Sequence, residues 1–341
     1  VTVPTGSYGD RTYTATWTAN EYTVTYDAAG GTVSSATQTV AYDSNVEYLI
    51  PERAGYTFLG WYENNTKHEN EKWTRTSDIT LVAKWDIIGY TISYEINDGT
   101  NHGENPTSYK VDTDTITLKD PSRTGYTFTG WTYEGQTTPT KDVTIEKGSV
   151  GNKTFTANWE AITTTITFNA NSGVCSTTEL SATYDQEFTL PEVTRSGYTF
   201  LGWFNNGTKY ESGTWKNYTN MELTAEWEII SYSITYELAG GTNALGNSTT
   251  YTVEQTVILE FPTRTGYTFL GWTYEGQTTP TKDVTIAKGS TGEKTYTANW
   301  EAISSTITLN PNGGACDPIT IPVTYDQEFT LPECVWSGHT F

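Results

Sequence analysis

The stretch GYTFLGWY, at Gly55–Tyr62, decides the fold because close copies of it return along the chain. GYTFTGWT begins at Gly125, GYTFLGWF at Gly197 and GYTFLGWT at Gly266, and a shortened GHTF begins at Gly338. Alternating aromatic residues are typical of a strand with one buried face, and glycines within it mark the strand entry and a bulge before the tryptophan. The phrase therefore predicts the core strand of a small repeated module.

A tryptophan that closes each module sets the period of the repeat. It ends phrases such as LVAKW and FTANW at intervals of 68 to 74 residues, namely at Trp17, Trp85, Trp159, Trp227 and Trp300. Self-similarity at such a period indicates a tandem array. We predict these parts: the C-terminal strand of a truncated long-type repeat at 1–17, module 1 (short type) at 18–85, module 2 (long type) at 86–159, module 3 (short type) at 160–227, module 4 (long type) at 228–300, and a truncated short-type repeat at 301–341.

The two module types alternate as a duplicated pair. The long modules share WTYEGQTTPTKDVTI, from Trp131 and from Trp272, which makes the pair 141 residues long. The third module and the last, truncated one share TYDQEFTLPE, from Thr183 and from Thr324.

Each module reads as about four strands. Phrases such as YTVTY and YTISYEI alternate large apolar residues with polar ones, which is the pattern of a half-buried strand, and turn signals such as AAGGT follow. We expect a second strand that ends at a proline, as in EYLIP and FTLPE, then the GYTF strand and the closing strand. No stretch has a convincing helical period, although the polar excursion after the GYTF strand has room for a short helical turn. The prediction is a mainly β array.

Composition excludes several classes of function. A net charge of −21 and a pI near 4.4 argue against a nucleic-acid or anionic-membrane partner. The chain has no run of 18 apolar residues, so we expect no membrane span. It starts and stops in mid-pattern, so we expect a segment of something longer or a processed piece.

Large aromatic side chains supply the predicted core, because a module of this size needs them to bury enough surface. The predicted structural core is Tyr56, Phe58, Trp61, Trp85, Tyr126, Phe128, Trp131, Trp159, Tyr198, Phe200, Trp203, Trp227, Tyr267, Phe269, Trp272 and Trp300. After each closing tryptophan come an acidic residue and an apolar pair rather than a flexible linker. We expect these junction residues to pack against a neighbour and to give a semi-rigid, elongated rod; they are Ile87, Ile88, Ile162, Ile229, Ile230 and Ile303.

These motifs resemble the Listeria–Bacteroides repeat, also called the InlB B-repeat. The module from Tyr22 to Trp85 matches best, through its first strand, its double glycine, GYTFLGWY and the closing LVAKW, and the resemblance covers essentially the whole chain. It implies small β-grasp-like modules of bacterial surface or secreted proteins, placed between a functional head and an anchor, with no catalytic residues. The long modules depart from the pattern by the insertion after Trp131 and Trp272, and the conformation of that loop stays open.

No repeated chemistry accompanies the repeated phrase. The four complete copies contain no Ser, Cys, His, Asp or Glu, so we expect neither an enzyme nor a cofactor. Asp185 and Asp326 lie beside turns and are expected to be solvated. VDTDT at Val111 has the carboxylate spacing of a calcium loop but lacks its glycine and distal glutamate, so we expect no metal site.

The three cysteines leave two readings open. Cys175 and Cys316 occupy the same place in the third and the last module, and Cys334 takes the place of Val193. A Cys316–Cys334 disulfide is one reading, and free, partly buried thiols are the other.

We predict an extracellular stalk at a bacterial cell surface. One alternative is an array that itself binds a host or environmental glycan or protein through loop aromatics, for which the candidate contacts are Trp73, Tyr133 and Tyr274. A second is a fibre subunit that associates end to end, with Val1–Trp17 adding a strand to the truncated last module of a neighbour.

Overall fold

The computed structural model describes residues 1–341 and contains strands but no helix. The chain divides into two compact units, Val1–Ile162 and Thr163–Phe341, and each is described by itself. The first unit holds modules 1 and 2. The second holds the strands of module 3, module 4 and the C-terminal part. The prediction of a mainly β array is confirmed, whereas the β-grasp likeness stays a prediction.

Module 1 is a mixed five-stranded sheet with a short additional ladder. Its strands are β1 (Glu21–Asp27), β2 (Thr37–Ala41), β3 (Asn45–Val46), β4 (Tyr56–Glu63), β5 (Thr66–His68), β6 (Glu71–Lys72) and β7 (Ile79–Ile87). The sheet order is β2-β1-β7-β4-β5, and β3 pairs with β6. The first and last strands, β1 and β7, run parallel, and the GYTF strand β4 runs antiparallel to β7.

The second strand of the sheet lies earlier than we predicted. The edge strand is β2, whereas the proline-ended segment EYLIP forms no strand and only follows the two-residue strand β3. The alternating residues TQTVA can pair along β1 with Val40 buried beneath, so this segment satisfies the edge of the sheet.

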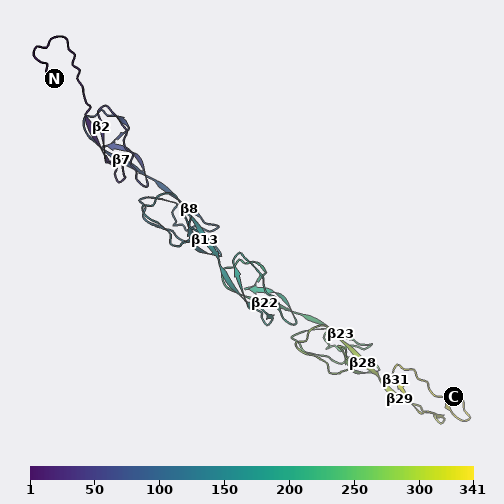
Figure 1. Cartoon of the computed structure of the whole chain (residues 1–341). Helices are drawn as coiled ribbons and strands as arrows, with labels where there is room; N and C mark the ends of the chain where they lie inside the picture. The colour runs from purple at the N-terminus through teal and green to yellow at the C-terminus, as the bar shows by residue number, and fades with distance from the viewer. The chain divides into compact units, whose positions relative to one another are not determined.

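Module 2 keeps the same central strands but replaces the β5 hairpin. Its strands are β8 (Gly89–Glu95), β9 (Ser108–Lys110), β10 (Ile116–Thr117), β11 (Tyr126–Thr132), β12 (Thr144–Ile145) and β13 (Lys153–Ala161). The order is β11-β13-β8-β9, with β8 and β13 side by side in Figure 1. The insertion of the long type turns back so that Thr140 exchanges two backbone hydrogen bonds with Trp131, of 2.8 and 2.9 Å. The insertion therefore stands in for β5.

The second unit repeats this pair of designs. Module 3 has β14 (Thr163–Asn169), β15 (Val174–Cys175), β16 (Glu179–Thr183), β17 (Glu187–Phe188), β18 (Val193–Thr194), β19 (Tyr198–Asn205), β20 (Thr208–Tyr210), β21 (Gly213–Thr214) and β22 (Met221–Ile229), with the order β16-β14-β22-β19-β20. Module 4 has β23 (Ser231–Glu237), β24 (Thr250–Thr252), β25 (Val257–Ile258), β26 (Tyr267–Thr273), β27 (Thr285–Ile286) and β28 (Lys294–Ala302), with the order β24-β23-β28-β26.

The two ends of the chain are less complete. The C-terminal part forms two separate ladders, β29 (Ser304–Thr308) with β31 (Thr320–Thr324), and β30 (Ala315–Cys316) with β32 (Cys334–Val335). The strand expected within 1–17 is not formed, and that prediction is wrong for this structure. In module 2 the matching segment, β13, is paired on both sides, by β8 and β11. Residues 1–17 have no such partner strands, and an unpaired strand is not stable by itself.

A β-bulge inside the GYTF phrase puts its phenylalanine and tryptophan on one face. In module 1, Phe58 lies opposite Trp85, but the next pair is Gly60 with Lys84, so Leu59 is the extra residue. Residues three apart on a strand normally face opposite ways, and one bulged residue brings Trp61 back to the side of Phe58. The same register shift occurs in modules 2, 3 and 4. The predicted bulge before the tryptophan is confirmed.

Each complete module has its own core around three aromatic rings. In module 1 the Phe58 ring centroid lies 5.4 Å from that of Trp61 and 5.4 Å from that of Trp85, in edge-on or tilted arrangements. Modules 2, 3 and 4 repeat this trio at 5.3 to 5.7 Å. The closing tryptophan also donates its indole N–H to a carbonyl of the first turn, as Trp300 does to Leu238 at 2.9 Å. Four separate clusters of buried residues result, one per complete module.

The bulge glycine should tolerate alanine less well in the long modules. Its φ is +137° at Gly60 and +140° at Gly130, so either substitution strains the backbone by about 1 to 3 kcal/mol. A Cβ at Gly60 would meet the flexible end of Lys67, whereas at Gly130 it would lie 2.6 Å from the backbone nitrogen of Thr140. We expect Gly130→Ala to lower the free energy of unfolding of module 2 more than Gly60→Ala lowers that of module 1. Hydrogen exchange resolved by module measures both, and equal losses would contradict the role of the Thr140 backbone.

Candidate functional site

The tyrosine of the GYTF phrase is not a core residue, which corrects the prediction for Tyr56, Tyr126, Tyr198 and Tyr267. These side chains are half-buried and belong to none of the four core clusters. Each ring instead lies under the guanidinium of the arginine three residues earlier, with the carbon of that group 3.6 to 3.8 Å from the ring centroid. The remaining predicted core residues lie in the clusters or pack against them.

The arginines were missed by sequence reasoning, although a signal was present. An arginine stands two residues before the glycine in all four complete phrases, as Arg53, Arg123, Arg195 and Arg264. Arg53 also donates a hydrogen bond of 3.0 Å to the carbonyl of Ala29 in the first turn. In the shortened last copy the two positions are Trp336 and His339, whose rings stack at 3.9 Å. In this copy both members of the arginine–tyrosine pair are thus replaced, and the two new rings still stack.

The junction isoleucines act through their backbone more than their side chains. The amides of Ile88, Ile162, Ile230 and Ile303 each donate a hydrogen bond of 2.9 Å to the carbonyl of the glycine that opens the preceding GYTF phrase. The side chains of Ile87, Ile88, Ile162 and Ile230 are half-buried. Ile229 and Ile303 are 36% and 50% exposed, so the prediction that every junction isoleucine packs is wrong for these two. The closing strand continues into the junction as an ordered ladder because the amide, not the side chain, is held.

Of the three candidate ligand contacts, Trp73 is excluded as a surface residue. It is only 1% exposed and belongs to the core of module 1, where it lies 6.2 Å from Tyr22 in a stacked arrangement. The short strand β6 just before it pairs with β3 and turns the indole inward. Tyr133 and Tyr274 are half-buried and pack against residues of strands β13 and β28. Their ring centroids lie 5.2 Å from that of Phe155 and 5.1 Å from that of Tyr296. Their role in binding stays a prediction.

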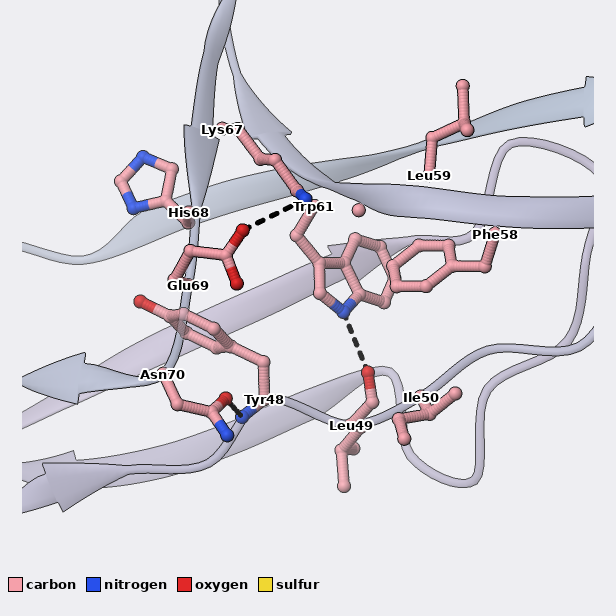
Figure 2. Close-up of a pocket in the computed structure, with 11 residues that line it drawn as sticks. Tyr48, Leu49, Ile50, Phe58, Leu59, Trp61, Lys67, His68, Glu69 and Asn70 are labelled. Atoms are coloured by element: carbon pink, nitrogen blue, oxygen red, sulfur yellow. Dashed lines mark hydrogen bonds and ion pairs between the residues drawn. The ribbon is translucent and has the colours of Figure 1, made fainter.

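A recess of about 500 Å³ opens on module 1 beside the Phe58 and Trp61 rings, as Figure 2 shows. Several of its polar groups are paired within the protein, and the Nε2 of His68 is the one buried side-chain polar atom of its lining without a hydrogen-bond partner. The Trp61 indole donates to Leu49 at 2.7 Å, the Tyr48 amide to Asn70 at 2.9 Å, and Lys67 lies 2.9 Å from Glu69. The recess therefore has no convergent set of unpaired polar groups with which to orient a polar ligand.

A charged network around His68 is confined to module 1. The two ring nitrogens of His68 lie 3.3 Å from a Glu71 oxygen and 3.6 Å from a Glu63 oxygen. Arg75 donates to both Glu63 oxygens, at 3.2 and 2.7 Å, and this hydrogen bonding lowers the pKa of the Glu63 carboxyl. Module 3 has Tyr210 in place of His68. The network ties β4 to the loop before β7 and is not a repeated chemical site.

The acidic residues near turns have side-chain partners. Asp185 accepts a hydrogen bond from Lys216, and Asp326 accepts one from Tyr267 at 2.9 Å, so the prediction that both are merely solvated is wrong. In VDTDT, Asp114 lies 2.9 Å from Lys147, which lowers the pKa of that carboxyl. No group of three or more His, Cys, Asp or Glu side chains is arranged to hold a metal ion.

The cysteines form one disulfide. Cys316 and Cys334 lie opposite each other on β30 and β32 and are bonded, with their Cα atoms 4.4 Å apart, so the free-thiol reading is wrong for this pair. Cys175 is a free thiol whose cross-strand neighbour is Val193. None of the four core clusters lies in the C-terminal part, and there the disulfide joins residues 18 apart.

Buried tyrosines should make the modules sensitive to alkali. Burial raises the pKa of Tyr94 in module 2 and of Tyr296 in module 4 to about 12, from an ordinary value of 10.0. A raised folded-state pKa adds stability that is present below pH 10 and is lost as the pH rises toward 12. Module 2 has Phe155 where module 4 has Tyr296. We expect Tyr296→Phe to raise the pH at which module 4 unfolds, as followed by hydrogen exchange. An unchanged midpoint would contradict this cause.

Comparisons with known proteins agree with the repeat seen in the structure. The model of the Listeria-Bacteroides repeat domain matches four times, at residues 22–84, 90–158, 165–226 and 232–299. A protein of Evansella cellulosilytica described as a Gly-rich membrane protein is 30% identical over 90% of this chain and 36% of its own length. Another from that organism, described as a membrane protein, is 31% identical over 76% of this chain and 40% of its own length. Internalin H of Listeria monocytogenes is 33% identical over 40% of this chain and 25% of its own length.

The chain thus spans between a quarter and two fifths of the curated relatives it matches. It contains no helix that is long and apolar enough to cross a membrane. The four family matches fall on the four complete modules, each with its GYTF strand and closing tryptophan. With more than half of its residues matched, the chain belongs to the Listeria-Bacteroides repeat domain family.

Proposed function

We propose that this chain is a non-enzymatic spacer segment of a bacterial cell-surface or secreted protein. Its modules would hold other parts of that protein at a distance from their attachment. Relatives described as membrane proteins, and Internalin H, support a place at the cell surface. The family match supports the reading of the chain as an array of repeats.

One observation carries the proposal: the residues that repeat are occupied with holding the modules together. The phenylalanine and tryptophans of each repeat form the core trio, and the bulge glycine aligns them. The opening glycine accepts the junction amide, as Gly197 does from Ile230 at 2.9 Å. A repeated binding site would instead leave repeated side chains exposed and unpaired. The repetition therefore fits a spacer that gains length better than a multivalent binder that gains avidity.

Deleting 160–300 offers a clean test of the spacer role. The chain reads NWEAI both at 158–162 and at 299–303, so the deletion removes one module pair and rejoins an identical junction. We expect the shortened chain, displayed between a surface anchor and a tagged folded domain, to bring the tag closer to the surface. The height of the tag above the surface, from fluorescence interference, measures this, and small-angle scattering of the free chain measures its extension. An unchanged tag height, or the scattering profile of a flexible coil, would contradict a spacer.

The binding alternative has its own readout. Glycan arrays and pull-downs with the whole chain are compared with Tyr133→Ala and Tyr274→Ala variants whose folding is verified by circular dichroism. Binding that disappears in these variants would replace the spacer proposal with an adhesive one. Trp73→Ala is unsuitable for this purpose because Trp73 is a core residue.

A further inference from the structure

Within each unit, the Gly–Tyr corner that opens a GYTF phrase lies against the following module, as the surroundings of Gly55, Gly197 and Gly266 show. Its tyrosine ring is held from one side by its own module, since Arg195 covers Tyr198 at 3.7 Å and also donates to the carbonyl of Asn171 at 3.4 Å. Arg264 covers Tyr267 in the same way at 3.6 Å. The arginine of the same module thus fixes the direction of the tyrosine hydroxyl independently of the neighbouring module.

In the second unit the hydroxyl of each such tyrosine reaches a carboxylate of the next module. Tyr198 of module 3 donates to Glu254 of module 4 at 2.5 Å. Tyr267 of module 4 donates to Asp326 of the C-terminal part at 2.9 Å. Both carboxylates lie in the turn that follows the second strand of the receiving sheet, after β24 and after β31. These hydrogen bonds raise the pKa of both tyrosines.

The residue just before the carboxylate covers the glycine of the corner. A Cβ on Gly197 would lie 1.8 Å from a methyl carbon of Val253, and one on Gly266 would lie 2.3 Å from the ring of Tyr325. The Tyr325 and Tyr267 rings also meet edge to face, with centroids 5.7 Å apart. The glycine is therefore required because a side chain of the neighbouring module occupies the place of its own.

The first unit contains the same corner without the hydrogen bond. Val111 of module 2 covers Gly55 of module 1, where a Cβ would lie 2.6 Å from the Cβ of Val111. Tyr56 is stacked by Arg53 at 3.8 Å but makes no hydrogen bond to Asp112, the residue that corresponds to Glu254. In the receiving turn, the tyrosine–carboxylate hydrogen bond forms where valine precedes glutamate and where tyrosine precedes aspartate. It does not form where valine precedes aspartate. A receiving turn that begins with valine therefore needs the longer glutamate side chain to reach the tyrosine hydroxyl.

We propose that the Gly–Tyr corner is a docking surface whose partner is the second turn of another module, and that the tyrosine–carboxylate hydrogen bond locks it. Two forms of lock exist, valine–glutamate at the junction of modules 3 and 4, and tyrosine–aspartate after module 4. The junction of modules 1 and 2 is docked but unlocked. The inference goes beyond the spacer role and stands or falls separately from it, because it concerns single junctions and not tag height or binding.

Spin-label distances in the full chain test the lock at one junction at a time. With Cys175→Ser and the native disulfide kept, labels are placed at the exposed positions Thr208→Cys in module 3 and Thr278→Cys in module 4. We expect a sharp distance peak that is lost in Tyr198→Phe, which removes only the hydroxyl. Carbon-13 spectra of tyrosine-labelled chain check the bond itself: Glu254→Ala should return the titration of Tyr198 toward ordinary pH.

A gain of function in the first unit completes the test. Labels at Thr66→Cys and Thr137→Cys occupy the matching places of modules 1 and 2. We expect a broader distribution there, which Asp112→Glu sharpens and which the matched control Tyr56→Phe leaves unchanged in the native background. Circular dichroism confirms folding of each variant. A peak at the module 3–4 junction that is broad in the parent, or equally sharp after Tyr198→Phe, would overturn the proposal, as would Asp112→Glu without effect.

Discussion

Replacing Trp272 by alanine is expected to destabilise module 4 strongly while modules 1 and 2 keep their stability. Trp272 is fully buried and contacts the rings of Phe269, Tyr236 and Tyr296. Truncating a buried tryptophan costs about 3 to 5 kcal/mol. A module of this size has roughly 4 to 11 kcal/mol of stability in total, taking about 0.05 to 0.15 kcal/mol per residue. Hydrogen exchange resolved by module should therefore show much weaker protection across β23–β28, with that of modules 1 and 2 unchanged.

Separate cores limit the damage to one module. The four buried clusters share no residue, and the complete modules have equivalent trios of aromatic rings. Loss of protection in modules 1 and 2 together with module 4 would show that the array unfolds as one cooperative unit. Full protection of module 4 would show that the trio is not its core.

Phenylalanine at the same position separates ring packing from the indole hydrogen bond. The Trp272 indole N–H is buried without a protein acceptor, whereas that of Trp203 donates to the Pro191 carbonyl at 3.0 Å. In the long modules the corresponding carbonyl, that of Glu260, is taken by the side chain of Asn247 at 3.0 Å. We expect Trp203→Phe to destabilise module 3 by about 1 kcal/mol more than Trp272→Phe destabilises module 4, since only the former loses a hydrogen bond.

Replacing Val193 by cysteine is expected to create a second disulfide and to stabilise module 3. Cys175 and Val193 are directly opposed on β15 and β18, as Cys316 and Cys334 are on β30 and β32. The native disulfide links residues 18 apart, and Cys175 and Val193 have the same separation. Closing a loop of this length stabilises a protein by about 3 kcal/mol when the native geometry is unstrained. Thermal unfolding with and without reductant measures the gain.

Thiol counting and a serine variant control this experiment. Under oxidising conditions the Val193→Cys chain should show no reactive thiol, whereas the parent shows one, that of Cys175. Val193→Ser changes the buried side chain without a crosslink and should lower the stability of module 3. If Cys175 and the new cysteine both remain reactive, the register of β15 and β18 does not support the pairing.

Much of the architecture could be predicted because aromatic residues recur at fixed spacing. The period placed the modules, and the glycine within the GYTF phrase indicated the bulge that aligns Phe58 with Trp61. The edge strand β2 was misplaced because TQTVA is short and mostly polar, while EYLIP is more apolar. Trp73 was misjudged because a polar loop surrounds it in sequence, and its burial depends on β6 pairing with β3.

The sequence by itself determined that this chain is an array, because a repeat of glycines and aromatic residues every 68 to 74 positions has no other economical structure. It also determined that the phenylalanine and tryptophan of the GYTF phrase and the closing tryptophan belong to the cores, since one strand face must be apolar. Only the tertiary structure decided that the phrase has two roles, with phenylalanine and tryptophan turned inward and, at the junctions inside each unit, Gly–Tyr turned toward the next module. The reason is that an aromatic ring suits a core and an interface equally well. What separates the two is the Arg195 stack on Tyr198 and the Glu254 carboxylate, which lies 56 residues away along the chain.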